Sequence, residues 1–168
     1  MTIRRMMAEI DGDFAVFLIG MRLNRPWRVD RWGPLALAMV RMLGDLRKGS
    51  EPGFLGAVLG LPVSVVYWRS YAELEAWALK PKGSHARAMA AFAQSGVEGR
   101  GDIGFWHETY LVRQGEYEAV YSGMPPFGLG AASKLVPVTP ERTSARQRLY
   151  KKSSSSVETP LVNPRLPD

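Results

Sequence analysis

The sequence predicts an α+β fold in which helices cover one face of an antiparallel sheet. A nearly continuous apolar run at residues 14–21 indicates a strand buried on both faces. Apolar residues at helical spacing follow between Trp32 and Leu46. Because strand and helix patterns then alternate again, the predicted order is β-α-β-β-α-β with one additional strand. This order is the ferredoxin-like split βαβ arrangement.

The middle of the chain shows a hairpin followed by a well-marked helix start. Residues 54–60 and 63–69 have strand character and are separated by a Leu-Pro pair. Ser70 and Glu73 match a capping box, in which both side chains satisfy free amides of the first helical turn. We therefore expect a helix over residues 71–79. A second helical segment is expected from Ser84 onward.

The strongest strand signal lies at residues 101–113, where aromatic and β-branched residues are concentrated. Side chains in a strand alternate between faces, which places His107 on one face and Glu108 on the other. The run at residues 117–121 follows at hairpin distance, so we expect these two strands to pair. Glu108 is expected to pair with an arginine.

Length and composition predict one domain with a tail. Residues 1–135 are assigned to the folded domain, and residues 136–168 to a basic tail rich in serine and proline. The tail is expected to be flexible or to dock on a partner subunit. Cutting the chain at Pro140 is therefore expected to cost little stability.

Charge and composition exclude several classes of protein. The net charge is +6, but half of it lies in residues 141–168, and the rest is spread along a body of mixed sign. This distribution does not predict nucleic-acid binding. No run of about 18 apolar residues predicts a membrane span, and the first 13 residues do not resemble a secretory signal. The sequence contains no cysteine, which fits a cytoplasmic location.

Several stretches together resemble a largely uncharacterised monooxygenase-like family of the dimeric α/β-barrel superfamily. These stretches are residues 9–22, 67–70, 104–110, 115–121 and 124–130, and the resemblance covers about residues 5 to 130. Because the predicted sheet has helices on one face only, we expect its other face to be covered by a second copy in a homodimer, or else by a loop or the tail. The resemblance implies a barrel formed by the sheets of two subunits, and a small-molecule substrate. Wider relatives include cofactor-independent monooxygenases, haem-degrading monooxygenases, haem aldoxime dehydratases and chlorite dismutases. The implied cofactor is therefore none or haem, because a fold alone does not select an activity.

The candidate catalytic residues are His107 and Tyr110. Histidine titrates near neutral pH and can act as a base, an acid or a metal ligand. His85 lies on a helical stripe and is expected to be structural. The expected substrate-binding residues are aromatic side chains for an apolar pocket wall and arginines for a carboxylate or a haem propionate: Trp68, Trp106, Tyr121, Arg22 and Arg69.

Three functions remain open on the sequence alone. The first is a cofactor-free monooxygenase that acts on a small apolar or aromatic molecule in a pocket between sheet and helices. The second is a haem enzyme with His107 as the axial ligand, and the third is a ligand-binding module without catalysis. No carboxylate or histidine cluster predicts a protein-bound metal ion, and no glycine pattern predicts a nucleotide site.

Overall fold

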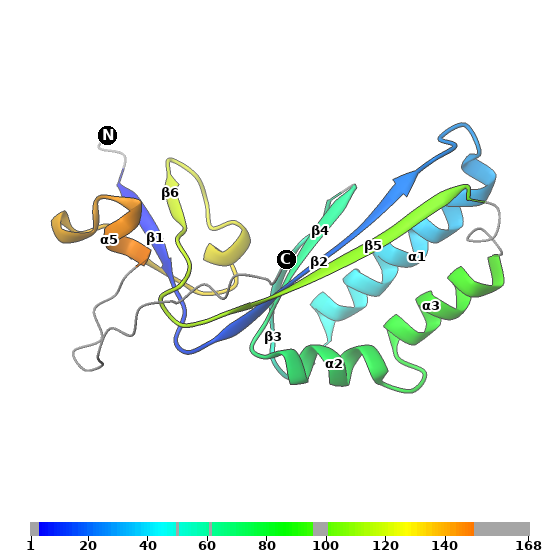
Figure 1. Ribbon diagram of the computed structural model, residues 1–168, viewed down its shortest axis with the longest axis horizontal. Coiled ribbons are helices and arrows are strands. Elements are labelled where there is room, and N and C mark those ends of the chain that lie inside the picture. Colours follow the sequence, from blue (N-terminus) through cyan, green and yellow to red (C-terminus); the bar gives the residue numbers. More distant parts are fainter. Residues whose placement is uncertain (1–3, 50, 61, 96–100, 150–168) are drawn as a thin grey trace, which may run out of the picture.

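A computed structural model describes residues 4–49, 51–60, 62–95 and 101–149. Within these residues a four-stranded sheet has helices on one face and a smaller three-stranded sheet at one end (Figure 1). In chain order the elements are β1 (Arg5–Glu9), β2 (Phe14–Leu23), α1 (Val29–Lys48), β3 (Phe54–Val58), β4 (Val63–Trp68), α2 (Tyr71–Leu79), α3 (Ser84–Ser95), β5 (Ile103–Val112), β6 (Val120–Ser122), the 3-10 helix η1 (Gly128–Gly130), β7 (Lys134–Pro137), the 3-10 helix η2 (Pro140–Arg142) and α5 (Ala145–Leu149).

The four-stranded sheet has the spatial order β3-β4-β2-β5, and all neighbouring strands are antiparallel. Along the chain its elements are β2, α1, β3, β4, α2 with α3, and β5. This is the β-α-β-β-α-β order, so the predicted α+β ferredoxin-like fold is confirmed. The helices α1, α2 and α3 cover a single face of the sheet (Figure 1). β5 forms one edge of the sheet beside them.

The main core lies between this sheet and its helices. Alternate residues of β2 point toward the helices and are buried, from Ala15 through Phe17 and Ile19 to Met21. The expected apolar stripe of α1 meets them, because side chains three and four residues apart share one helix face. Its buried members are Leu35, Met39, Met42, Leu43 and Leu46.

Helix α2 begins where the sequence predicted. The Ser70 hydroxyl accepts a hydrogen bond from the Glu73 amide at 3.2 Å, which satisfies one free donor of the first turn. The Glu73 carboxylate accepts a hydrogen bond from the same hydroxyl at 3.0 Å. The two capping residues therefore bond to each other, and the serine side chain caps the helix as predicted.

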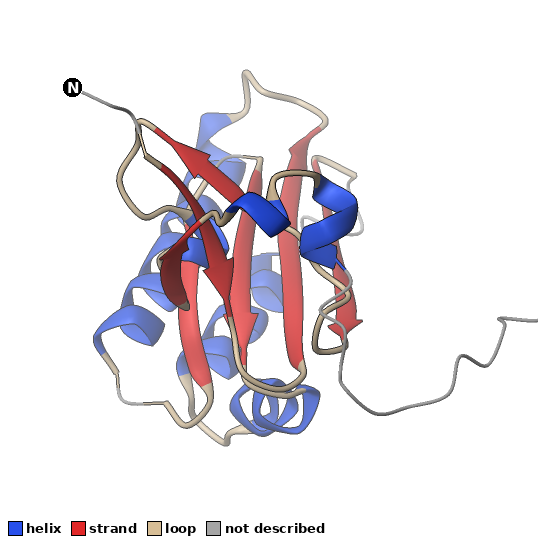
Figure 2. Cartoon of the chain, turned by 90° about the vertical axis from the view of Figure 1, so that its left-hand side faces the viewer, coloured by secondary structure: helices blue, strands red, loops and turns tan. Residues whose placement is uncertain are grey.

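The smaller sheet corrects one prediction. Its order is β6-β1-β7, and β6 pairs with β1, with Met6 opposite Tyr121. The expected hairpin between β5 and the strand after it is wrong. Residues 5–9, for which no strand is predicted from the sequence, form β1 and pair with β6. Figure 2 looks onto this end, where the smaller sheet lies across the larger one.

Tyr117 explains why the chain leaves β5 after its last residue. The turn at Gly115 has a positive φ of 85°, which favours glycine. Beyond it, the Tyr117 hydroxyl accepts a hydrogen bond from the Ile10 amide at 2.7 Å. The Tyr117 ring also meets Phe14 edge to face, with 5.2 Å between ring centroids. These contacts direct the segment toward β1, away from the edge of β5.

The sheet face opposite the helices is partly covered by the chain itself. A second apolar cluster joins Phe14 of β2 to Tyr121 of β6 and Leu129 of η1. Farther along the same face, Val16, Val65 and other side chains border a groove of about 450 Å³. The apolar face is therefore closed at one end by the smaller sheet and open over the rest.

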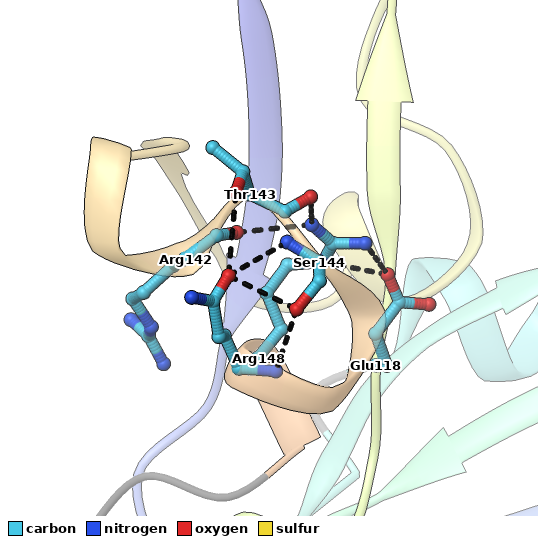
Figure 3. Close-up of polar contacts among 6 residues, drawn as sticks. Glu118, Arg142, Thr143, Ser144 and Arg148 are labelled. Atoms are coloured by element: carbon cyan, nitrogen blue, oxygen red, sulfur yellow. Dashed lines mark hydrogen bonds and ion pairs between the residues drawn. The ribbon is translucent and has the colours of Figure 1, made fainter.

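The segment after β7 is folded over residues 140–149, where the sequence analysis expected flexibility or docking on a partner. Arg148 of α5 is only 7% exposed and forms an ion pair with Glu118 at 2.6 Å. The same guanidinium donates hydrogen bonds to the carbonyls of Arg142 and Thr143 at 3.0 and 2.6 Å (Figure 3). Because a buried guanidinium needs such partners, Arg148 fixes α5 against its own chain. The rest of the predicted tail lies outside the described residues.

The longest described helix, α1, carries charged residues along its length, including Asp30, Arg41 and Asp45. No helix in the described part of the chain has the length and apolar character needed to cross a membrane.

Candidate functional site

A cavity of about 320 Å³ lies between the edge strand β5 and the helices α2 and α3. We call it the β5–α3 cavity. Its walls are mostly apolar and aromatic, and two imidazoles, one carboxylate and two hydroxyls contribute polar groups. The lining residues are Phe17, Ile19, Tyr71, Leu74, Glu75, Trp77, Ala78, Leu79, His85, Met89, Phe105, His107 and Thr109.

The fold produces this cavity at an edge of the main core. Alternation along β5 directs Phe105, His107 and Thr109 toward the helices, as the sequence predicted. The α2–α3 corner then carries Trp77 and His85 to the opposite wall. Because no strand of the described residues lies on the outer side of β5, the space beside it is open to solvent in this part of the chain. A ligand can therefore enter without unfolding the core.

His107 borders the cavity, and its side chain is exposed. Its ring lies over Phe17, with 5.7 Å between centroids and 39° between ring planes. The catalytic hypothesis requires this histidine to face a cavity, and the structure meets that requirement.

His85 lies on the opposite wall, where one hydrogen bond and one aromatic contact hold its ring. Its Nδ1 atom lies 2.9 Å from the carbonyl oxygen of Ala78, near the end of α2. Its ring packs on Trp77 with 5.1 Å between centroids. The sequence analysis assigned His85 a structural role, and these contacts do hold the α2–α3 corner together. They also place a second imidazole in the β5–α3 cavity.

Tyr110 and Trp106 lie on the other face of β5. Tyr110 donates a hydrogen bond to the carboxylate of Glu108, and this bond is the main reason that the pKa of Tyr110 is raised. The partner of Glu108 is therefore a tyrosine and not the expected arginine. Trp106 covers Gly20 of β2, where an added Cβ would lie 2.5 Å from its ring. Neither aromatic residue shares the cavity with His107.

Trp68 and Tyr121 are also outside the β5–α3 cavity. Trp68 has no exposed surface and packs in the main core between Phe54 and Trp77, at centroid distances of 5.8 and 5.4 Å. Tyr121 belongs to the second apolar cluster, where its hydroxyl accepts a hydrogen bond from the Gly130 amide at 2.7 Å. These aromatic residues form two separate cores.

The two predicted arginines lie away from this cavity as well. Arg22 is exposed near the end of β2 and opposes Gly104 of β5. Arg69 donates a hydrogen bond to the carbonyl of Asp11, and its Nε and Nη2 atoms are buried without a partner among the described residues. The described lining of the β5–α3 cavity therefore contains neither arginine nor lysine.

Trp77, Glu75 and the position of His85 in the cavity are not predicted by the sequence. The helix that carries Trp77 and Glu75 is predicted correctly over residues 71–79, so both residues could have been considered as lining for a pocket. The position of His85 depends on how α3 folds back on α2, which the local pattern does not show. No group of three or more His, Asp or Glu side chains in the described residues could hold a metal ion.

A family model described as Monooxygenase af470-like matches residues 14–129 of this chain. The chain belongs to the Monooxygenase af470-like family. The match runs from β2 to η1 and includes every residue that lines the β5–α3 cavity. It confirms the resemblance found in the sequence and supports a monooxygenase-like function in general terms. No curated protein matches the chain.

The β5–α3 cavity does not fit haem, the cofactor that the sequence resemblance leaves open. His85 and His107 provide imidazoles that suit axial ligation. However, the described lining offers no basic side chain for the propionates, and Glu75 adds a negative charge. The polar side chains of the described lining therefore favour an uncharged organic ligand.

Proposed function

We propose that this chain is a monooxygenase that oxidises a small, uncharged, apolar or aromatic molecule in the β5–α3 cavity. The observation that carries the proposal is this cavity of about 320 Å³, whose apolar walls hold two imidazoles. Its volume falls in the range of about 300 to 1,000 Å³ common for small-ligand pockets. Family membership supports the reaction type in general terms.

The lining supports an aromatic substrate without a strong negative charge. Phe17, Trp77 and Phe105 offer aromatic surfaces, which favour stacked or edge-to-face contact with a flat ring. Glu75 would repel a carboxylate or phosphate, and the described lining has no cation to offset it. A neutral ring with one acidic O–H group suits these walls.

The proposed reaction uses molecular oxygen and needs no bound cofactor. A ring carbon of the phenol-type substrate, which is a CH₂ group in the keto form, reacts with O₂ to give a carbonyl group and water, and the substrate supplies all four electrons. Loss of a proton makes such a substrate a better electron donor, so an imidazole in the cavity would act as the base. His107, the candidate predicted from the sequence, would contact the substrate from β5. Packing of the substrate between β5 and α2 would orient the reacting carbon.

The other predicted site residues have no place in this cavity. Trp68 and Tyr121 support the two cores, while Arg22 and Arg69 lie at other edges. A role for Tyr110 or Trp106 in substrate binding would require a second site on the opposite sheet face. Those assignments stay predictions.

We also propose a homodimer formed through the open sheet face. The groove of about 450 Å³ on this face is bordered by Val16, Val58 and Val65, and Phe127 beside it is 53% exposed. Burying such apolar surface against a second copy is favourable. Light scattering should then give a mass near twice the 18.7 kDa of one chain. A monomer mass at micromolar concentration would contradict this assembly.

The absence of cysteine supports a reducing location such as the cytoplasm.

The proposed function is tested by oxygen uptake with a panel of uncharged phenols and hydroquinones. The purified chain should consume oxygen with at least one member, and it should show no Soret band. A co-purified ligand identified by mass spectrometry would define the panel more closely. Ligand binding without oxygen uptake would favour the non-catalytic binding module instead.

A further inference from the structure

The hydrogen bond at His85 determines which nitrogen of its ring carries a proton. Nδ1 lies 2.9 Å from the Ala78 carbonyl oxygen, and a carbonyl oxygen can only accept. Nδ1 must therefore be the donor. In the neutral ring the lone pair is then on Nε2, which is the atom that can take a proton.

The Nε2 atom of His85 is not fully buried. It has no hydrogen-bond partner among the described residues, and it is absent from the buried polar atoms that lack one. The ring that carries it is half-buried and lines the β5–α3 cavity. Capping the end of α2 accounts for the hydrogen bond at Nδ1. It does not account for the position of the ring, and of its Nε2 atom, at a cavity.

A helix C-terminus and a carboxylate lie at the same cavity as the His85 ring. Ala78 lies in the last turn of α2, and the C-terminal end of a helix carries a partial negative charge that favours cations. The other titratable groups of the cavity are Glu75 and Tyr71 on α2 and His107 on β5. Tyr71 donates a hydrogen bond to Glu75 at 3.3 Å. A carboxylate therefore faces the same space as the imidazole.

His107 differs from His85 in its exposure and in its lack of a hydrogen bond. Its side chain is exposed, and no hydrogen bond to a described residue fixes its ring orientation or its protonated nitrogen. A base with a fixed lone pair is better oriented for proton transfer than one whose ring turns freely.

We propose that His85 is the general base of the β5–α3 cavity, an inference that rests on the proposed function. Its Nε2 atom takes the proton of an acidic O–H group on a neutral phenol-like substrate. The substrate becomes a phenolate and the ring becomes an imidazolium, while the Nδ1–H group keeps its hydrogen bond to the Ala78 carbonyl oxygen. Trp77 holds the plane of the imidazole through this transfer. His107 contacts the substrate from the opposite wall.

The test uses para-nitrophenol, whose phenolate absorbs visible light, with the full-length chain. Bound to the wild-type protein, the probe should be more ionised than the free probe at the same pH. The variant His85→Asn keeps an N–H donor for the Ala78 carbonyl but has no base. It should therefore fold with an unchanged thermal midpoint, bind the probe and lose the extra ionisation.

Two results would overturn the proposal. If His85→Asn binds the probe and keeps the extra ionisation, His85 is not the base. If ionisation is lost in His107→Asn and kept in His85→Asn, the base is His107. Failure of the wild-type chain to bind any small phenol is a different result, because it removes the proposed function and this inference with it.

A second measurement covers the case in which His85→Asn does not fold. The chain has two histidines, so long-range nitrogen–proton NMR spectra of the wild-type protein resolve both rings. The His85 ring should show a protonated Nδ1 and an unprotonated Nε2 when neutral. A neutral His85 protonated on Nε2 would contradict the proposal directly.

Discussion

His85 on α3 and His107 on β5 line the same cavity, but their rings are held differently. His85 is bonded to the Ala78 carbonyl and packed on Trp77, whereas His107 rests on Phe17 without a hydrogen bond to any described residue. The fixed ring suits proton transfer, and the exposed ring suits contact with a ligand at the mouth of the cavity. The two imidazoles therefore should respond differently to mutation.

Replacing His107 with alanine should affect ligand handling more than stability. The side chain is exposed, and surface substitutions usually change the free energy of unfolding by no more than about 0.5 kcal/mol. Oxygen uptake should fall at least about tenfold, equivalent to about 1.4 kcal/mol in the barrier. His85→Ala removes the proposed base, so oxygen uptake should fall in this variant too, and the lost bond to Ala78 should additionally cost about 0.5 to 1.5 kcal/mol in stability. Denaturant unfolding and oxygen-uptake measurements on both variants check this, and unchanged uptake in His107→Ala would remove its assigned role.

Much of the main fold follows from local patterns. The apolar run of β2, the stripe of α1 and the serine cap of α2 each predict an element that the structure contains. Alternation along β5 also predicts correctly that His107 and Tyr110 face opposite ways. These features depend on neighbours in sequence, and that is why they can be predicted.

The rest depends on contacts between distant segments. β1 is only five residues long and of mixed polarity, so its pairing with β6 has no clear local signal. The choice of partner depends on contacts such as that of Tyr117 with Ile10. The aromatic residues Trp68 and Tyr121 looked equivalent in sequence, yet the fold places them in separate cores. For the same reason, His85 could not be assigned to a cavity before the α2–α3 corner was known.

Glycine at position 20 should be required by the packing of Trp106. A Cβ there would lie 2.5 Å from the Trp106 ring and 2.6 Å from the Pro62 carbonyl oxygen, so Gly20→Ala should cost about 1 to 3 kcal/mol through overpacking. Gly44 is the matched control, because it lies inside α1 and a Cβ there meets nothing within 4 Å. Gly44→Ala should stabilise the protein by about 0.5 to 1 kcal/mol. Denaturant unfolding measures both changes, and equal effects of the same sign would contradict this account.

The ion pair between Arg148 and Glu118 should hold residues 140–149 in place. Removing the guanidinium leaves two carbonyls and a partly buried carboxylate without their donor, so Arg148→Ala should cost about 1.5 to 3 kcal/mol. Hydrogen exchange should increase mainly over residues 140–149. Arg146→Ala is the control, since Arg146 is an exposed arginine on the same short helix. Equal exchange in the two variants would show that Arg148 does not fix α5. The prediction that a cut at Pro140 costs little stability would then stand.

Alkaline pH should weaken the fold partly through Tyr67. Burial, with a smaller effect of Tyr121, raises the pKa of Tyr67 above its ordinary value of 10.0. The folded state then holds this proton more tightly than the unfolded state. The free energy of unfolding should consequently fall as the pH rises above about 10. Tyr67→Phe should make this fall shallower, as measured by denaturant unfolding across that pH range, and an unchanged slope would contradict the assignment.

The most direct test of the β5–α3 cavity as the substrate site is oxygen uptake by a variant in which the cavity is filled. Thr109 is exposed at the edge of β5 and lines the cavity, so Thr109→Trp should fill the space without disturbing the main core. Leu111 lies on the same strand face, is 71% exposed and is outside the lining, which makes Leu111→Trp the control. With a phenol that the wild-type chain oxidises, Thr109→Trp should lose most oxygen uptake while Leu111→Trp keeps it. Full uptake by a folded Thr109→Trp variant would place the reaction elsewhere on the protein.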